Sequence, residues 1–183
     1  MASDFSIRHA AHVMRNGGVI AYPTDTIYGL GCDPYNTVAI DELNVLKQRP
    51  LNKQFILLAG QIEQISSLVI ITEAQKTLIA QTTEPTSWIV DANPQAPGWL
   101  TSKQNTLTIR ISKNTIVKKL CAMLGHAIIS TSANPSGKRP ASNSLELHHY
   151  FHNRLHKILA CQQRLGAQPS KIIRLCDNHV IRH

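Results

Sequence analysis

Short apolar runs alternate along the chain with segments of helical periodicity, and this alternation constrains the fold more than any other feature. Val19–Tyr22, Phe55–Ala59 and Ala127–Ser130 are typical of short buried strands. Thr106–Ser112 alternates between aliphatic and polar residues, which indicates a strand with two different faces. Because strands and helices are intermixed, we predict a layered α/β domain around a mixed sheet.

The helices and the remaining strands have weaker signals. Ser3 or Asp4 can cap a first helix, and Gly17-Gly18 would end it. The apolar stripe of this helix is expected at Ile7, Ala10, Ala11 and Met14. The stretch from about Ile62 to Ala80 is expected to be helical but interrupted by loops. Further helices are expected near Thr37–Lys47, Thr115–Leu124 and Leu145–His152, and short strands at Lys171–Leu175 and His179–Arg182.

The composition suggests one domain with an anionic partner. The length, 183 residues, fits a single domain over residues 1–183. The chain has 19 Lys and Arg against 11 Asp and Glu, a net charge of +8. That excess indicates a nucleotide, a nucleic acid or an acidic membrane surface as partner, although general solubility would also explain it.

The compartment is expected to be the cytoplasm. The N-terminus lacks the pattern of a signal peptide, and no apolar run is long enough to span a bilayer. The cysteines are far apart and form no C-x-x-C pair, so we expect free thiols in a reducing environment. They are Cys32, Cys121, Cys161 and Cys176.

Hydroxyl groups follow the first predicted strand, within Tyr22–Gly31, at a place where α/β proteins often bind ligands. Thr24 and Thr26 lie two residues apart, so both hydroxyls would face the same way in an extended segment. Gly29 and Gly31 would let the backbone approach a ligand closely. An ordinary strand-exit turn explains this loop equally well when it is taken alone.

A cluster of cations stands at the end of the second predicted helix. Lys47, Arg49 and Lys53 could bind a phosphate chain, because Arg supplies a planar fork and Lys a point charge. Cations at a helix C-terminus also satisfy the helix dipole, so this simpler interpretation stays open.

A second polar segment, Ser130–Arg139, begins where an apolar run ends. It contains hydroxyls, the amide of Asn134, a glycine and two cations, which together could cradle an anion. A solvated Asn-Pro turn is the alternative. Arg110, on the polar face of its strand, and Ser170, at the turn before the last strands, are weaker candidates, since a solvent-facing Arg on an antiparallel strand is common.

Several well-known sites are absent from the sequence. It contains no G-x-x-x-x-G-K-[ST], G-x-G-x-x-G or H-E-x-x-H motif, and no serine or cysteine stands beside an obvious base. His148, His149 and His152 have a helical spacing that could bind a metal, but a solvated helix face is favoured. We therefore nominate no metal site and no covalent nucleophile.

Taken in order, these segments resemble the YrdC-like family, the threonylcarbamoyl-AMP synthases. The resemblance covers nearly the whole chain, and the length of the chain is similar to that of the short bacterial form. It implies a single open layered α/β domain, with a twisted mixed parallel and antiparallel sheet flanked by helices and a large basic cleft. It rests on Tyr22–Gly31, Lys47–Pro50, Thr106–Arg110, Ser132–Gly137 and Pro169–Ser170.

The resemblance also implies a reaction in which L-threonine, bicarbonate (or CO2) and ATP give L-threonylcarbamoyladenylate and pyrophosphate. This is the first step of the t6A37 modification of tRNA, and partner proteins of the t6A-transfer machinery would complete it. Mg2+ would arrive with ATP rather than occupy a site of the protein. An RNA-binding module without catalysis is the alternative that the net charge supports, and a related enzyme acting on a different amine or carbamoyl donor is another.

The same resemblance implies roles for individual residues. Lys47 and Arg49 would hold the ATP phosphates and neutralise charge on the α-phosphate and the leaving pyrophosphate, which is the main need of nucleotidyl transfer. ATP would also contact Thr106, Ser130, Asn134 and Arg182. Threonine, its carboxylate paired with Arg110, would bind among Thr24, Thr26, Arg110, Ser132 and Ser170.

Two segments depart from the pattern of the family. Thr82–Ser87 keeps only Pro85 and a hydroxyl of the usual Trp-Pro-Gly-Pro-x-Thr run. In Pro169–Arg174 the usual final acid is replaced by Arg174, and Leu58 stands where some relatives carry a His. These differences concern the expected threonine pocket and the rim of the cleft. They leave Lys47 and Arg49, the residues expected to bind the phosphates, unchanged.

Overall fold

The computed structural model describes residues 2–48, 54–160, 165 and 168–182. Its helices are α1 (Asp4–Arg15), α2 (Thr37–Lys47), α3 (Glu73–Gln81), α4 (Thr115–Leu124) and α5 (Ser144–Phe151), with a short 3-10 helix, η1 (Ile62–Gln64). Its strands are β1 (Ile20–Pro23), β2 (Tyr28–Gly31), β3 (Ile56–Ala59), β4 (Val69–Ile70), β5 (Thr86–Ala92), β6 (Thr106–Ile111), β7 (Ile128–Ser132), β8 (Lys157–Ile158), β9 (Lys171–Arg174) and β10 (Val180–Arg182).

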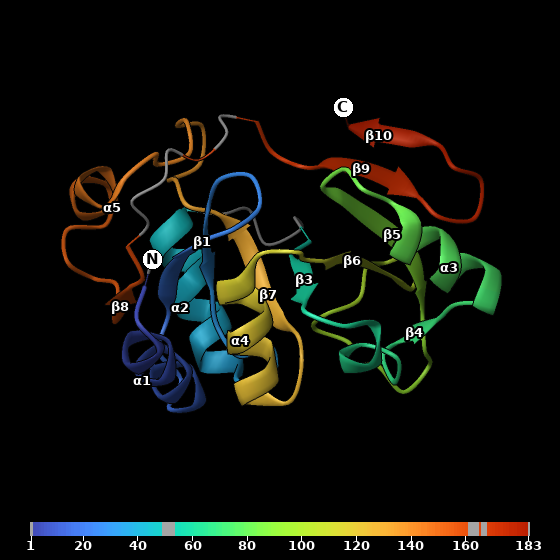
Figure 1. Cartoon of the computed structure of the whole chain (residues 1–183), viewed down its shortest axis with the longest axis horizontal. Coiled ribbons are helices and arrows are strands. Elements are labelled where there is room, and N and C mark those ends of the chain that lie inside the picture. Colours follow the sequence, from blue (N-terminus) through green and yellow to red (C-terminus); the bar gives the residue numbers. More distant parts are fainter. Residues whose placement is uncertain (1, 49–53, 161–164, 166–167, 183) are drawn as a thin grey trace.

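The strands form a mixed sheet in the order β10-β9-β5-β6-β3-β7-β2-β1-β8, with β4 paired to β5. The pairs β3–β6, β5–β9 and β1–β8 are parallel, whereas β5–β6, β3–β7 and β2–β7 are antiparallel. Helices α1, α2, α4 and α5 gather around the half of the molecule that contains β1 and β7, and α3 lies beside β5 at the other end (Figure 1). The predicted class, a mixed open sheet flanked by helices, is confirmed.

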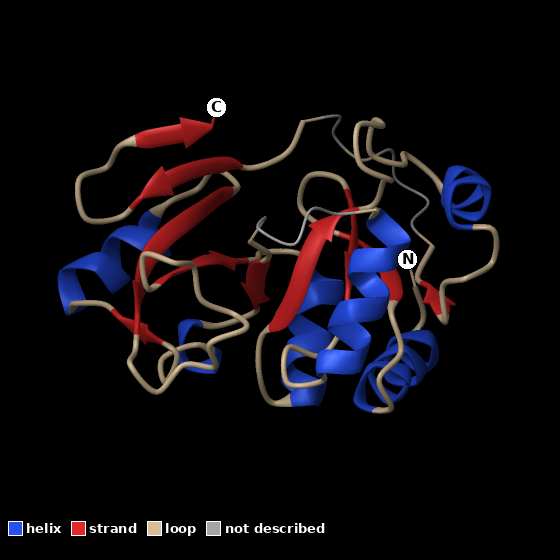
Figure 2. Cartoon of the chain, turned by 180° about the vertical axis from the view of Figure 1, so that it is seen from behind, coloured by secondary structure: helices blue, strands red, loops and turns tan. Residues whose placement is uncertain are grey.

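The core consists of two apolar clusters, a larger one that extends from β1, β2 and α2 to β5 and β6, and a second one formed by α1, α4, β1, β3 and β7. Along β1 successive side chains alternate, so Ile20 and Tyr22 pack with the apolar residues of α1 and α4, whereas Ala21 packs in the cluster that includes Leu43 of α2. Both faces of β1 are therefore buried, which explains its continuous apolar sequence. Figures 1 and 2, which view the chain from opposite sides, show the helices on either side of these strands.

The predicted helices form where their local signals place them. Ser3 caps α1 by accepting a hydrogen bond from Ser6 N, and the buried stripe of α1 is the predicted one, Ile7, Ala10, Ala11 and Met14. Gly17 follows the helix with φ +83°, a conformation that glycine adopts readily. None of the helices in the described ranges has the length and apolar character needed to cross a bilayer.

The sequence pattern does not predict β2 and β5, and the interpretation of Tyr22–Gly31 as a loop is wrong in its second half. Tyr28–Gly31 forms a strand between β1 and β7 despite its two glycines. A Cβ at Gly31 would lie 2.3 Å from Ile129 O and 2.8 Å from Tyr22 Oη, so glycine is needed there for strand packing rather than for approach to a ligand. The 62–80 stretch also contains β4, which we expected to be helix or loop.

Candidate active site

An open cavity of about 160 Å³ lies where the β1–β2 loop, β3, β6 and β7 meet the ends of β9 and β10. Polar side chains from distant parts of the chain line it. The structure brings together there most of the candidates from the sequence, namely Thr24, Thr26, Arg110, Ser130, Ser132, Ser170 and Arg182. It also adds residues that the sequence analysis did not select, among them Gln54, Thr108 and Thr131.

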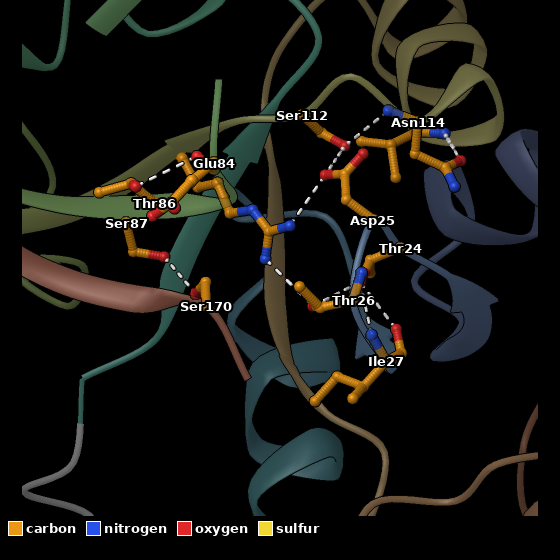
Figure 3. Close-up of polar contacts among 12 residues, drawn as sticks. Thr24, Asp25, Thr26, Ile27, Glu84, Thr86, Ser87, Ser112, Asn114 and Ser170 are labelled. Atoms are coloured by element: carbon orange, nitrogen blue, oxygen red, sulfur yellow. Dashed lines mark hydrogen bonds and ion pairs between the residues drawn. The ribbon is translucent and has the colours of Figure 1, made fainter. Parts of the chain in front are cut away.

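The hydroxyls of Thr24 and Thr26 face each other in a tight turn, not in the extended segment that we expected. Thr24 Oγ1 donates to Ile27 O at 2.7 Å and accepts from Thr26 N at 3.2 Å. The two Oγ1 atoms are 3.2 Å apart. Figure 3 shows the hydrogen bonds that connect Thr24, Thr26 and Ile27. Because Thr24 is anchored by backbone groups, its position is fixed before any ligand binds.

Arg110 is the main charged group of the cavity. It is only 5% exposed, so the alternative of a solvent-facing arginine is wrong. Its Nη2 donates to Asp25 Oδ2 at 2.8 Å, and its Nη1 lies 3.4 Å from Thr26 Oγ1. Its buried Nε has no hydrogen-bond partner among the described residues. Burial lowers the pKa of Arg110 and the Asp25 carboxylate opposes this effect, so the guanidinium stays charged.

A second guanidinium, that of Arg182, stands at the same cavity. Its Nη2 and Nε donate to Ser170 O at 2.8 and 3.2 Å, and Ser170 Oγ lies 2.9 Å from Ser87 Oγ. Partial burial and, to a smaller degree, the positive charge of Arg110 lower the pKa of Arg182. Two like charges at one cavity favour an anionic ligand. The resemblance places Arg182 with the nucleotide, but its contacts here are with a residue expected to bind threonine.

Lys47 does not line this cavity. It is 4% exposed, and its Nζ donates to the backbone carbonyl oxygens of Ser132 and, at 2.7 Å, Asn134. Asn134 in turn donates through Nδ2 to Lys138 O at 2.5 Å. Lys47 therefore connects the end of α2 to the loop after β7. Arg49, the other cation expected to bind phosphate, lies outside the described residues.

Thr106 also lies away from the cavity. Its Oγ1 is 2.8 Å from Ser102 Oγ, in a turn before β6, and the cavity is lined instead by Thr108, two residues further on the same face. Alternation from Arg110 would have identified Thr108 from the sequence. Asp25, by contrast, has a partner 85 residues away, which no local pattern reveals.

The model of the Sua5/YciO/YrdC family, described as "Telomere recombination", matches residues 12–183. The chain belongs to this family. The threonylcarbamoyl-AMP synthase of Halorhodospira halophila is 39% identical over 153 residues, which cover 82% of this chain and 80% of that protein. The family assignment thus rests on a family model that covers nearly the whole chain.

Solved structures of the family have the same fold. E. coli YciO superposes with a TM-score of 0.86 at 26% identity, over 97% of this chain and 88% of that one. P. abyssi Sua5 complexed with L-threonine gives a TM-score of 0.86 at 25% identity, over 96% of this chain and 52% of that one. The mixed sheet flanked by helices that the resemblance implies is therefore confirmed.

The two segments that depart from the family pattern lie side by side in the structure. Thr86 of β5 is paired with Lys171 of β9, and Lys171 Nζ forms an ion pair with Glu84. The hydrogen bond that Lys171 donates, together with its positive charge, lowers the pKa of Glu84. Both groups are exposed, so the pair contributes little to stability. The two segments are therefore neighbours in the sheet and are joined by one exposed ion pair.

Proposed function

We propose that this chain is a threonylcarbamoyl-AMP synthase that converts L-threonine, bicarbonate (or CO2) and ATP to L-threonylcarbamoyladenylate and pyrophosphate. The observation that carries the proposal is the single cavity in which two guanidinium groups, Arg110 and Arg182, stand among hydroxyl side chains. An amino acid with a carboxylate and a hydroxyl complements such a lining. Its family relatives with this name support the proposal.

The threonine carboxylate would pair with Arg110. This guanidinium lines the cavity, and its Nη1 makes only a 3.4 Å contact with Thr26 Oγ1, so a ligand oxygen could accept a shorter hydrogen bond from it. The hydroxyls that would complete the pocket come from three strands or their loops. They are Thr24, Thr26, Ser132 and Ser170.

ATP would bind on the side of the cavity formed by Ser130 and the loop after β7. Lys47 is buried beneath this loop, and its positive charge would act on the phosphates together with that of Arg49. Asn134 would contribute by shaping the loop, and Arg182 would act between the two substrates. Thr106 lies away from the cavity, so Thr108 on the same face of the strand would contact the nucleotide in its place. Mg2+ would enter with the triphosphate.

The chemistry would proceed in two steps. The threonine amine attacks the carbon of bicarbonate, with loss of water, to give a carbamate. A carbamate oxygen then attacks the α-phosphorus of ATP, and pyrophosphate leaves with the bonding electrons. None of the described residues that line the cavity is Asp, Glu or His. Positioning of the substrates and electrostatic stabilisation would therefore carry the rate.

The proposal is tested by incubating the protein with ATP, Mg2+, bicarbonate and each amino acid in turn, while pyrophosphate release is followed. Threonine should accelerate release well above the rate without an amino acid. A rate that is the same with and without threonine would refute the proposal. The same panel separates this enzyme from a relative that acts on a different amine.

The product would pass to the proteins that transfer the threonylcarbamoyl group to tRNA in the t6A pathway. A cytoplasmic location fits this role and the free thiols of Cys32, Cys121 and Cys176. Any direct contact with tRNA would be weak and electrostatic, so its affinity should fall steeply with salt.

A further inference from the structure

Asp25 occupies a position that the proposed mechanism does not use. It lies between Thr24 and Thr26, but its carboxylate points towards the end of β6 (Figure 3). Its Oδ2 accepts two hydrogen bonds, from Arg110 Nη2 at 2.8 Å and from Ser112 Oγ at 2.7 Å. Asp25 does not line the cavity that contains Arg110. Asp25 therefore contacts Arg110 from outside this cavity.

The contact divides the donors of Arg110 into two groups. Asp25 takes Nη2, whereas Nη1 has only the long contact with Thr26, and Nε has no partner among the described residues. A long arginine side chain has several rotamers, and fixing it in one conformation costs conformational entropy. The ion pair with Asp25 offsets that cost in the free protein. Nη1 is then available to an incoming carboxylate, whereas Nε is fully buried.

Ser112 fixes Asp25 in turn. Ser112 is fully buried, its backbone N donates to Ala59 O at 2.8 Å, and its Oγ accepts from Asn114 N at 3.2 Å. The single hydroxyl proton of Ser112 therefore goes to Asp25. Asn114 is the N-cap of α4. The series Asn114–Ser112–Asp25–Arg110 thus connects a helix end to the guanidinium.

We propose that Asp25 is a positioning residue that orients Arg110 for the substrate carboxylate, and that Ser112 acts through Asp25. This inference rests on the proposed function, because it takes threonine as the ligand of Arg110. It concerns threonine binding alone. ATP makes no contact with Arg110 in the proposed arrangement, so the effect of losing Asp25 should be selective.

The first test compares Asp25→Asn with the wild-type protein. The Kd of threonine is measured by calorimetry, and the KM values of threonine and ATP are measured from pyrophosphate release. Asp25→Asn should raise the Kd and the KM of threonine at least about tenfold and change the KM of ATP by less than about twofold. The matched control is Asp33→Asn, in which an acid outside the cavity, beside His126, loses its charge. It should leave both KM values unchanged.

The second test is a double-mutant cycle with Ser112→Ala, a milder change that keeps the Asp25 charge. Ser112→Ala alone should raise the threonine KM by about threefold, and in the Asp25→Asn background it should have no further effect. This result separates a series of contacts from two independent losses. Thermal unfolding of each variant shows whether the fold is retained, and the Ser112→Ala data decide the matter if Asp25→Asn does not fold.

The outcomes separate this inference from the proposed function. Threonine binding by the wild type together with an unchanged Kd in Asp25→Asn, or an equal rise in the KM values of both substrates, would overturn the role of Asp25 only. Additive effects in the double variant would overturn the role of Ser112. An absence of threonine binding by the wild-type protein would overturn the proposed function and this inference together.

Discussion

Lys47 Nζ donates to Asn134 O at 2.7 Å, so the last residue of α2 is tied to the loop that follows β7. The carbonyl of Ser132 accepts a further hydrogen bond from the same ammonium, and Ser136 N donates to Lys47 O at 2.9 Å. Helix and loop are thus joined by both the side chain and the backbone of one lysine. Lys47, which is expected to bind the ATP phosphates, therefore also has a structural role.

Lys47→Ala should reduce both activity and stability. The substitution removes the Lys47 donor from the buried carbonyl oxygen of Asn134, at a cost of about 1–3 kcal/mol, and it removes a positive charge near the proposed phosphates. We expect a lower melting temperature and a loss of at least about tenfold in threonine-dependent pyrophosphate release. Thermal unfolding and initial rates check the two parts separately.

The control for this prediction is Lys76→Ala, since Lys76 Nζ forms an ion pair with exposed Glu73 at the surface. That variant should stay within about 0.5 kcal/mol of the wild type. If Lys47→Ala melted at the wild-type temperature, Lys47 would not be a structural link. Wild-type rates in both Lys47→Ala and Arg49→Ala would remove the phosphate role.

Arg182→Ala should weaken threonine binding more than ATP binding. Nε and Nη2 of Arg182 donate to Ser170 O, and Ser170 is a proposed threonine contact. Loss of these hydrogen bonds and of one of the two positive charges at the cavity should raise the threonine KM by about tenfold, which corresponds to about 1.4 kcal/mol. Steady-state kinetics with each substrate varied in turn decide the matter. A rise in the ATP KM that exceeds the rise in the threonine KM would show that Arg182 contacts ATP instead.

Gly31→Ala should destabilise the fold. Its Cβ would lie 2.3 Å from Ile129 O, in the adjacent strand β7, and overpacking of this kind costs roughly 1–3 kcal/mol. The melting temperature should fall by several degrees. Gly98→Ala is the control, because a Cβ there meets no atom within 4 Å. Equal melting temperatures for the two variants would show that β2 and β7 are not packed as described.

Burial should protect two of the thiols from alkylation. Burial raises the pKa of Cys32 and of Cys121 to about 12, so almost none of either thiol is ionised at pH 8. Exposed Cys176 should react with iodoacetamide in the native protein, whereas Cys32 and Cys121 should react only after unfolding. Peptide mass spectrometry identifies the labelled sites. Labelling of Cys32 at the rate of Cys176 would contradict their burial.

The same two thiols should make the fold sensitive to alkali. Because each binds its proton more tightly in the folded than in the unfolded chain, their contribution to stability is complete below the unfolded pKa of 9.0 and is lost as pH rises from there towards 12. The midpoint of urea unfolding should accordingly fall above about pH 9. Conservative Cys→Ala variants at both positions should reduce this dependence on pH, and an unchanged dependence would exclude the thiols as its source.

The parts of the fold predicted from sequence are those with strong local signals. The stripe of α1 and the apolar runs of β1, β3 and β7 are each readable within a few residues. The sequence does not predict β2, because Gly29 and Gly31 argue against a strand, and it forms one by pairing with the neighbouring strands β1 and β7. β5 likewise depends on pairing with β6 and β9, which are distant in sequence.

The candidate site shows the same division. Thr24, Thr26 and Arg110 were selected from strand ends and from a motif order, and the fold brings them to one cavity. The sequence gives no signal for Asp25, because its partner Arg110 lies 85 residues away. Thr106 was selected from a motif but lies outside the cavity, since the cavity begins only at Thr108. Sequence alone identifies the residues of a strand face but not where along that face a cavity begins.

The most direct test of the account is detection of the product itself. The protein is incubated with ATP, Mg2+, L-threonine and 13C-bicarbonate, and the nucleotides are separated and analysed by mass spectrometry. The account predicts threonylcarbamoyladenylate that contains one 13C atom, formed together with pyrophosphate and strongly reduced in Arg110→Ala. Pyrophosphate or AMP without a 13C-labelled threonyl adduct would contradict it.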